Sequence, residues 1–190
     1  MRLPSYRLGV VLAFILQAGL IAWLVADRAM LIADGKEIRL AVVPVDPADL
    51  FRGDFVTLSY PISRIASTAV SGDHDFTYAE PIYVSLADDG DGGWKATAIA
   101  HAPPASGVFL KGTVQDVGDG GACAGVSECT LYEVSYNLEQ WFVPEGTGHE
   151  LEKLRNGQKL SVDVAVASDG RAALKRLLVD GQVKYVEGLY

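Results

Sequence analysis

The stretch GVVLAFILQAGLIAWLVA, residues 9–26, decides how this chain is organised. It contains no charged residue, and Gln17 is its only polar one. A helix of this length rises about 27 Å, close to the roughly 30 Å of hydrocarbon in a bilayer. A soluble helix of the same length would keep a polar face, which this stretch lacks. We therefore predict a transmembrane helix, with Trp23 at its outer interface.

The charges on either side of this stretch predict its orientation. Arg2 and Arg7 precede it, whereas Asp27 and Arg28 follow it and cancel each other. Positively charged flanks stay in the cytoplasm. The N-terminus is therefore predicted to lie inside, with everything after about residue 30 outside the cytoplasmic membrane. For a Gram-negative source that compartment is the periplasm.

The end of the stretch does not resemble a signal-peptidase cleavage site, which needs small residues before the cut. At the two nearest possible cuts, large residues stand where small ones are needed: Leu24 three residues before the first cut, and Arg28 directly before the second. We therefore predict an uncleaved signal anchor over residues 1–30 and an extracytoplasmic domain over residues 31–190.

Length and charge limit what this domain can be and bind. The chain has 190 residues, with 16 Lys and Arg against 24 Asp and Glu and a net charge of −8. The part of the chain after the anchor is long enough to bury one core. An acidic surface is repelled by nucleic acid and by anionic lipid headgroups. We expect no nucleic-acid partner, and contact with the lipid bilayer through residues 9–26.

The two cysteines, Cys123 and Cys129, flank a short loop. In an oxidising compartment such a pair can form a disulfide; two free buried thiols are the alternative. A metal site is disfavoured because neither a second cysteine pair nor a histidine pair has ligand spacing. We expect no metal and no cofactor.

Apolar residues at alternate positions run through the domain, as in strands with one face in a core. The clearest core-facing runs are Val56, Leu58 and Tyr60; Tyr132, Val134, Tyr136 and Leu138; and Leu160, Val162, Val164 and Val166. The residues between them, such as Asp163 and Ala165, are predicted to form a wetter face.

Turn residues separate the strands and complete the fold prediction. The segment 88–93, DDGDGG, predicts a hairpin between strands at 82–86 and 94–100. Thr147 and Glu150 have capping-box spacing, which predicts one short helix. We predict a mostly β chain: an N-terminal transmembrane helix, then an antiparallel β barrel or sandwich with a short helix.

The segment VDPADLFRGDFVTLSYPIS, residues 45–63, is the most distinctive part of the domain. Gly53 can adopt positive φ at little cost, and Asp54 can accept hydrogen bonds from turn amides. We interpret Asp54 as structural in preference to catalytic.

Residues 53–60, GDFVTLSY, resemble the signature of the GDYXXLXY protein family, with Phe55 in place of the motif tyrosine. The order of segments 46–52, 141–148 and 170–181 also agrees with that family. This resemblance spans most of the chain. It implies a membrane-anchored protein of uncharacterised biochemical role, accompanied by a polytopic membrane protein.

A weaker resemblance links residues 52–56 and Tyr60-Pro61 to a strand of type I signal peptidases. Their mechanism needs a serine activated by a lysine of lowered pKa. Lys111 loosely resembles the lysine, but residues 45–47, where the serine box should lie, contain no serine. A hydrolase scaffold is therefore the alternative, and it lacks a recognisable Ser-Lys pair.

Two groups of residues are candidates for contact with a partner. Within the anchor these are Gln17, a polar side chain that can hydrogen-bond to another helix, and Gly19, which permits close approach. In the domain, loop acids such as Glu145 favour binding. The candidate motif or binding residues are Arg52, Gly53, Asp54, Phe55, Leu58, Tyr60 and Glu145. The predicted role is that of a non-enzymatic accessory or binding subunit, and a stand-alone binder of an envelope ligand is a further alternative.

Overall fold

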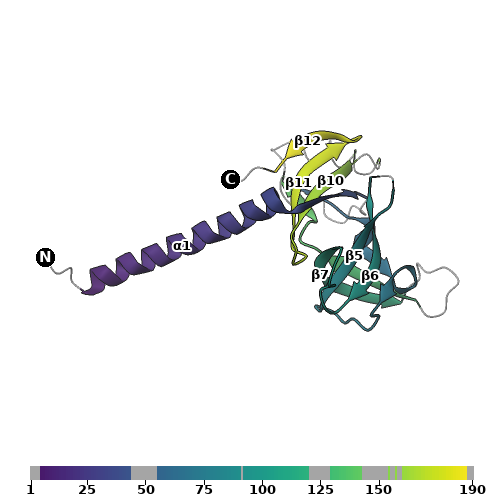
Figure 1. Cartoon of the computed structure of the whole chain (residues 1–190), viewed down its shortest axis with the longest axis horizontal. Coiled ribbons are helices and arrows are strands. Elements are labelled where there is room, and N and C mark those ends of the chain that lie inside the picture. Colours follow the sequence, from purple (N-terminus) through teal and green to yellow (C-terminus); the bar gives the residue numbers. More distant parts are fainter. Residues whose placement is uncertain are drawn as a thin grey trace.

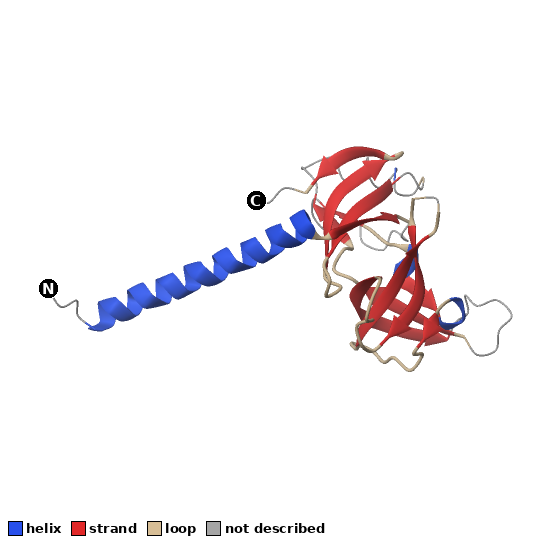
Figure 2. Ribbon diagram, viewed as in Figure 1, coloured by secondary structure: helices blue, strands red, loops and turns tan. Residues whose placement is uncertain are grey.

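The structure is a computed structural model, and it describes residues 5–43, 55–90, 92–119, 129–142, 154, 157 and 160–187. One long helix leads into a domain built from curled β-sheets (Figures 1 and 2). The predicted fold class, mostly β with an N-terminal helix, is confirmed.

Helix α1 (Ser5–Asp34) has 30 residues and extends away from the domain (Figure 1). At 1.5 Å per residue its length is about 45 Å. Residues Leu8–Asp34 are apolar enough and long enough to cross a membrane, and their most apolar window is not covered by the rest of the protein. An apolar helix that its own domain leaves uncovered agrees with the predicted membrane anchor.

A four-stranded antiparallel sheet follows α1 directly. Its order is β1-β10-β11-β12, with β1 and β12 at the edges. Its strands are β1 (Lys36–Ala41), β10 (Leu160–Val166), β11 (Ala172–Val179) and β12 (Gln182–Val186). The first strand of this sheet therefore pairs with a strand more than a hundred residues later in the chain.

A six-stranded sheet forms the other large part of the domain, in the order β3-β8-β7-β5-β6-β4. Its pairs are antiparallel except for β4 and β6, which are parallel. Its strands are β3 (Arg64–Ala66), β4 (Ser71–Gly72), β5 (Pro81–Asp88), β6 (Trp94–Ala100), β7 (Val108–Asp119) and β8 (Thr130–Ser135). The predicted hairpin at residues 88–93 joins β5 to β6.

Short elements connect the two larger sheets. Strands β2 (Phe55–Thr57) and β9 (Gln140–Phe142) form a separate antiparallel pair. Two 3₁₀ turns, η1 (Pro61–Ser63) and η2 (Ser67–Ala69), flank β3. The helix predicted from Thr147 to about residue 155 falls almost entirely outside the described residues.

All three sheets contribute to one hydrophobic core. The core-facing runs predicted from alternation are all buried: Val56, Leu58 and Tyr60; Tyr132, Val134, Tyr136 and Leu138; and Leu160, Val162, Val164 and Val166. Period-two patterning predicted these faces because a strand exposes alternate side chains to opposite sides.

The second face of β10 is a correction to the sequence prediction. Asp163 and Ala165 were expected on a wetter face, yet both are buried. Ala165 packs with Leu31 of α1 and Ala173 of β11. Asp163 is covered by the side chains of two arginines on the neighbouring strands. Alternation alone could not show that the end of the anchor covers this face.

Candidate functional site

The residues of the family signature divide into a part that is described and a part that is not. Arg52, Gly53, Asp54 and Glu145 lie outside the described residues, so their predicted role stays a prediction. The backbone of Phe55 pairs with Phe142 in the β2–β9 ladder. Leu58 and Tyr60 are each only 1% exposed. These last two residues therefore belong to the core and cannot contact a partner directly.

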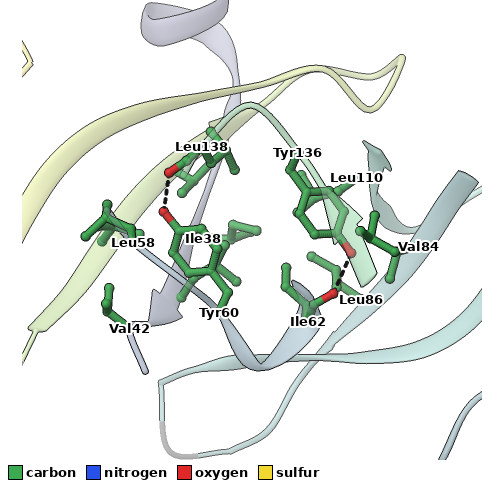
Figure 3. Packing of buried hydrophobic residues seen from close by; sticks show 14 of the residues in the cluster. Ile38, Val42, Leu58, Tyr60, Ile62, Val84, Leu86, Leu110, Tyr136 and Leu138 are labelled. Atoms are coloured by element: carbon green, nitrogen blue, oxygen red, sulfur yellow. Dashed lines mark hydrogen bonds between the residues drawn. The ribbon is translucent and has the colours of Figure 1, made fainter. Parts of the chain in front are cut away.

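Tyr60 has a specific structural role in that core. Its hydroxyl donates a hydrogen bond of 2.6 Å to the carbonyl of Leu138, while the hydroxyl of Tyr136 donates one of 2.7 Å to the carbonyl of Ile62 (Figure 3). Two buried tyrosines thus each bond to the segment that carries the other. Burial raises the pKa of both hydroxyls well above the ordinary value, so both keep their protons.

Glu139 closes the turn that directly follows β8 and carries Tyr136. Its carboxylate accepts hydrogen bonds from the backbone amides of Tyr136 and Leu138, at 2.6 and 3.0 Å, and from the hydroxyl of Ser135. Asn137, at the turn, adopts positive φ, which asparagine tolerates better than most residues. The carboxylate satisfies amides that the end of β8 leaves without strand partners.

Cys129 lies half-buried just before β8 and is disulfide-bonded. The hydroxyl of Thr68, in η2, is 3.6 Å from its sulfur. Cys123, the predicted partner, lies outside the described residues. The pairing of Cys123 with Cys129 therefore stays a prediction.

The clearest site that the structure assembles is the contact between the anchor and the domain. We call it the junction: Asp27–Gly35 of the helix end together with Ala167–Arg171, the turn between β10 and β11. Helix α1 ends at Asp34 and β1 begins at Lys36, so Gly35 alone separates them. A Cβ atom at Gly35 would lie 2.5 Å from the carbonyl oxygen of Leu31 and 3.0 Å from the Cβ of Ala165. Only glycine lets the helix and the sheet come this close.

Arg171 makes the polar contacts of the junction. Its guanidinium forms a bidentate ion pair with Asp27, at 2.5 and 3.2 Å, and a third contact of 2.7 Å with Asp169. The hydrogen bonds to Asp27 and Asp169 raise the pKa of Arg171, which stays charged. Nearby, Arg28 donates a long hydrogen bond of 3.4 Å to the carbonyl of Ala172. A fork of donors on a carboxylate fixes direction, so these contacts orient the helix on the sheet.

The same turn also contacts the six-stranded sheet. The carbonyl of Gly170 accepts a hydrogen bond of 2.8 Å from the amide of Lys111 in β7. Gly170 has φ +84°, and a Cβ there would lie 2.6 Å from the ring of Phe109. Glycine is therefore required for both conformation and space. Through this turn, α1 is connected to both large sheets.

Two cavities lie beside the junction. The larger, about 520 Å³, is bordered by the end of α1, the start of β1 and the start of β7. Its lining combines apolar Met30, Phe109 and Val166 with Asp34 and Lys36. The ammonium of Lys36 also lies 5.3 Å from the centre of the Trp94 ring, a cation–π contact.

We call the second cavity, of about 410 Å³, the basic cavity because Arg28, Lys111 and Arg171 line it. Asp27 is its only acidic lining residue among those described. Thr113 and Asn137 add polar groups. Asp27 and Arg171 line both cavities, so the two adjoin each other at the junction.

The predicted membrane contacts, Gln17 and Gly19, are both in the exposed part of α1. A Cβ at Gly19 would meet no atom of the protein within 4 Å. Residues two positions apart differ by about 200° around a helix, so they point to nearly opposite sides. One partner helix can therefore contact Gln17 or Gly19, but not both.

A histidine cluster lies at the end of β6, away from the signature. The ring nitrogens of His101 are 2.9 Å from a carboxylate oxygen of Asp75 and 3.1 Å from one of Glu80. The ring also stacks on Phe76, with centroids 4.1 Å apart. The hydrogen bond to Asp75 raises the pKa of His101, and the pKa of Asp75 is lowered by the same contact. Across the ranges that the structure describes, no group of three His, Cys, Asp or Glu side chains could hold a metal ion.

Asp163 is the centre of a charged network on the outer face of the four-stranded sheet. Arg39 of β1 contacts its carboxylate at 2.7 and 3.2 Å, and Arg176 of β11 contacts it at 2.9 Å. A bulge in β11 leaves Lys175 without a register partner on β10. It lets Lys175 and Arg176 both reach Glu37 of β1. This network joins three strands but encloses no cavity of its own.

Sequence reasoning missed both the junction and the histidine cluster. Asp27 and Arg171 are 144 positions apart, and His101 and Asp75 are 26 apart. Neither pair has a motif spacing. The sequence prediction uses Asp27 and Arg28 only as charges that cancel, although a charge directly after an apolar run is a signal for an interfacial contact. His101 and its acidic neighbours come together only because the loops before β5 and after β6 meet.

A long apolar N-terminal helix joined through one residue to a β domain is the arrangement that the described residues define, and it is compatible with a membrane-anchored protein. The model of the family described as GDYXXLXY protein matches residues 17–177. The match covers most of the chain, which therefore belongs to the GDYXXLXY family. No curated protein and no solved structure matches the chain.

Proposed function

We propose that this protein is a non-enzymatic accessory subunit of a polytopic membrane protein. In this proposal α1 crosses the cytoplasmic membrane with its N-terminus inside, and the β domain lies on the outer side, the periplasm in a Gram-negative cell. The helix contacts the partner within the bilayer, and the junction sets how the domain is presented to it.

One observation carries this proposal: the membrane-length part of α1 is uncovered by its own domain, whereas its last turns pack against the four-stranded sheet and pair with Arg171. The exposed part includes a polar side chain, Gln17, in an otherwise apolar surface. Polar side chains and small residues are what membrane helices use to associate, because lipid supplies no hydrophobic driving force. A mere tether would need neither a polar residue in the span nor a docked end.

Rigid docking supports an accessory role more than that of a tethered binder. A flexible linker would let the domain search a large volume, but here a single glycine separates α1 from β1. A rotation or tilt of the helix against a partner is therefore passed to both sheets through Arg171 and Gly170. Such coupling suits a subunit whose orientation is set by a membrane partner.

The hydrolase alternative gains no support from the surroundings of Lys111. The residue is exposed and lines the basic cavity, whose described lining includes Thr113 and Tyr136 but no serine. The hydroxyl of Tyr136 is already bonded to the carbonyl of Ile62. Activation of a nucleophile by lysine requires hydrogen-bond reach between the two groups.

The test is affinity purification of the full chain from native membranes in mild detergent, followed by mass spectrometry. Two variants run beside the wild type: Gln17→Leu removes the polar group, and Gly19→Leu blocks close approach on the opposite side of the helix. The proposal predicts that one polytopic protein co-purifies stoichiometrically and that one of the two variants weakens its recovery.

The matched control is Val11→Leu, which keeps the span apolar and lies at least about 80° around the helix from both positions. Recovery of the partner should be unchanged in this variant. If the wild type is recovered without any polytopic protein, the accessory role is rejected. A partner that is retained equally by both variants would place the contact outside this part of the helix.

A further inference from the structure

We propose that the basic cavity binds the headgroup of an anionic phospholipid. The proposal rests on the membrane placement of α1, and it needs neither a protein partner nor a particular orientation. Its support comes from the position of the cavity, from two cations that have no carboxylate partner among the described residues, and from its continuity with the apolar helix.

The basic cavity lies at headgroup depth. The uncharged run of α1 ends at Ala26, and the next two residues, Asp27 and Arg28, already line the cavity. The polar region of one leaflet is about 5–7 Å thick, the distance spanned by four or five helical residues. A cavity that begins one residue after the apolar run therefore opens among the phosphates of the leaflet.

The cations of the cavity are not equivalent. Arg171 is neutralised by Asp27 and Asp169, with contacts of 2.5 and 2.7 Å. Within the described parts of the chain, neither Arg28 nor Lys111 has a carboxylate within 4 Å. These two cations therefore lie beside one cavity with their charge uncompensated, in a protein whose net charge is −8.

This charge pattern selects the class of ligand. An arginine and a lysine together match the geometry and charge of a phosphate group, the arginine as a planar donor and the lysine as a point charge. Two uncompensated cations favour a headgroup with net negative charge over a zwitterionic one. The hydroxyl of Thr113 and the amide of Asn137 offer hydrogen bonds to the headgroup beyond its phosphate.

The apolar part of the same lipid has a place to lie. Leu31 lines the cavity, and Leu24 is exposed on α1 less than two turns before Arg28. A phosphate between Arg28 and Lys111 would leave its acyl chains beside the uncovered helix. A ligand free in solution gains nothing from this continuity, so the geometry favours a lipid over inorganic phosphate.

The larger cavity does not share these properties. Its charged lining residues are Asp27, Asp34, Lys36 and Arg171, so its acids equal its bases. Lys36 is also engaged with the ring of Trp94. The comparison assigns anion binding to the basic cavity alone.

The experiment is native mass spectrometry of the full chain in detergent, titrated with phosphatidylglycerol, with phosphatidylcholine, or with inorganic phosphate alone. The double variant Arg28→Gln/Lys111→Gln removes both of these cations. The control Lys95→Gln/Lys184→Gln makes the same change in net charge at exposed positions on β6 and β12. Circular dichroism confirms that each variant is folded.

The wild type and the control should bind phosphatidylglycerol about tenfold more tightly than phosphatidylcholine, because cations near the membrane surface select anionic lipid. The double variant should lose this preference. Equal binding of the two lipids by the wild type, or an unchanged preference in the double variant, would overturn the proposal. Saturation by inorganic phosphate that prevents lipid binding would assign the site to a soluble anion.

Failure to purify a protein partner leaves all of these results unaffected, so the two proposals can fail separately.

Discussion

The contact between the segment that follows β2 and the segment that precedes β9, and the contact between the anchor and the domain, are built in opposite ways. In the first, Tyr60 and Tyr136 form fully buried hydrogen bonds within an apolar core. At the junction, Arg171 and Asp27 form an ion pair in which both side chains remain substantially exposed. One contact is buried in the core, and the other lies at the surface of the protein.

The difference indicates that the stability of the domain and its orientation on the helix depend on different contacts. A buried hydrogen bond matters because a lost partner leaves a desolvated polar group, whereas an exposed ion pair is screened and contributes little. We infer that the interior holds the domain folded, and that the junction sets the angle between the domain and the helix.

The largest effect is expected inside the core, in Leu58→Ala. Leu58 belongs to the family signature and is 1% exposed, so its truncation leaves a cavity. The free energy of unfolding should fall by about 2–5 kcal/mol in a denaturant titration. Val183→Ala, on the exposed edge strand β12, is the control and should change it by less than about 0.5 kcal/mol. Similar losses in both variants would show that Leu58 is not part of a packed core.

A smaller effect is expected from Tyr60→Phe and from Tyr136→Phe. Each removes one buried hydroxyl and leaves a carbonyl, of Leu138 or Ile62, without that donor. Each should lower the free energy of unfolding by about 1–3 kcal/mol. Tyr83→Phe, at a partly exposed position on β5, serves as the control and should have less effect. Neutral results for both buried tyrosines would show that these hydrogen bonds do not stabilise the packing of the segment after β2 on the segment before β9.

Arg171→Gln should affect orientation more than stability. Its loss frees Asp27 and Asp169, but both carboxylates can be hydrated. Unfolding should change less than in the tyrosine variants. Distances between spin labels at Ala22 and Lys95, measured by pulsed electron resonance in nanodiscs, should become more widely distributed. Arg64→Gln breaks an exposed ion pair with Glu133, between β3 and β8, and should leave the distribution narrow. An unchanged distribution in Arg171→Gln would assign the orientation to Gly35 and Leu31 alone.

The smallest effect is a pH dependence of the loop contact at His101. Its folded-state pKa is raised above the ordinary value of 6.5 by the hydrogen bond to Asp75. A raised histidine pKa stabilises the folded state below pH 6.5, and this contribution is lost as the pH rises through the raised value. Asp75 and Glu80 have lowered pKa values, so their contribution is lost only at acidic pH, below their ordinary values of 3.8 and 4.5.

Hydrogen exchange of the amides of residues 73–80 measures this effect. Protection should be greater at pH 6 than at pH 8.5 in the wild type, after correction for intrinsic exchange rates. The variant His101→Gln should show no such difference, while His74→Gln, at a neighbouring exposed histidine, should retain it. A pH difference that persists in His101→Gln would show that another group is responsible.

The sequence predicted those parts of the fold that depend on local pattern. The apolar anchor, the alternation around Val56 and Tyr132, and the hairpin between β5 and β6 all derive from the period of the side chains or from turn residues. The junction could not be predicted in this way. Asp27 meets Arg171, and Ala165 is buried beneath Leu31, only because β1 pairs with β10 across a long chain separation.

The candidate site shows the same division. Tyr60 was singled out by the family signature, but its partner, the carbonyl of Leu138, is a backbone group that no side-chain motif reveals. Gln17 and Gly19 were found as unusual residues in an apolar run, and helical geometry then places them on different sides. Arg28 and Lys111 became a possible ligand site only when the turn of Gly170 brought β7 beside the helix end.

The central claim is that the uncovered part of α1 contacts a polytopic membrane protein. The most direct test places a photo-cross-linking amino acid at position 17 or at position 19 of the full chain in native membranes. The account predicts an adduct with one polytopic protein from one of these positions, and a much weaker one from the opposite side of the helix. Adducts with lipid alone from both positions would contradict the claim and leave α1 as an anchor without a protein partner.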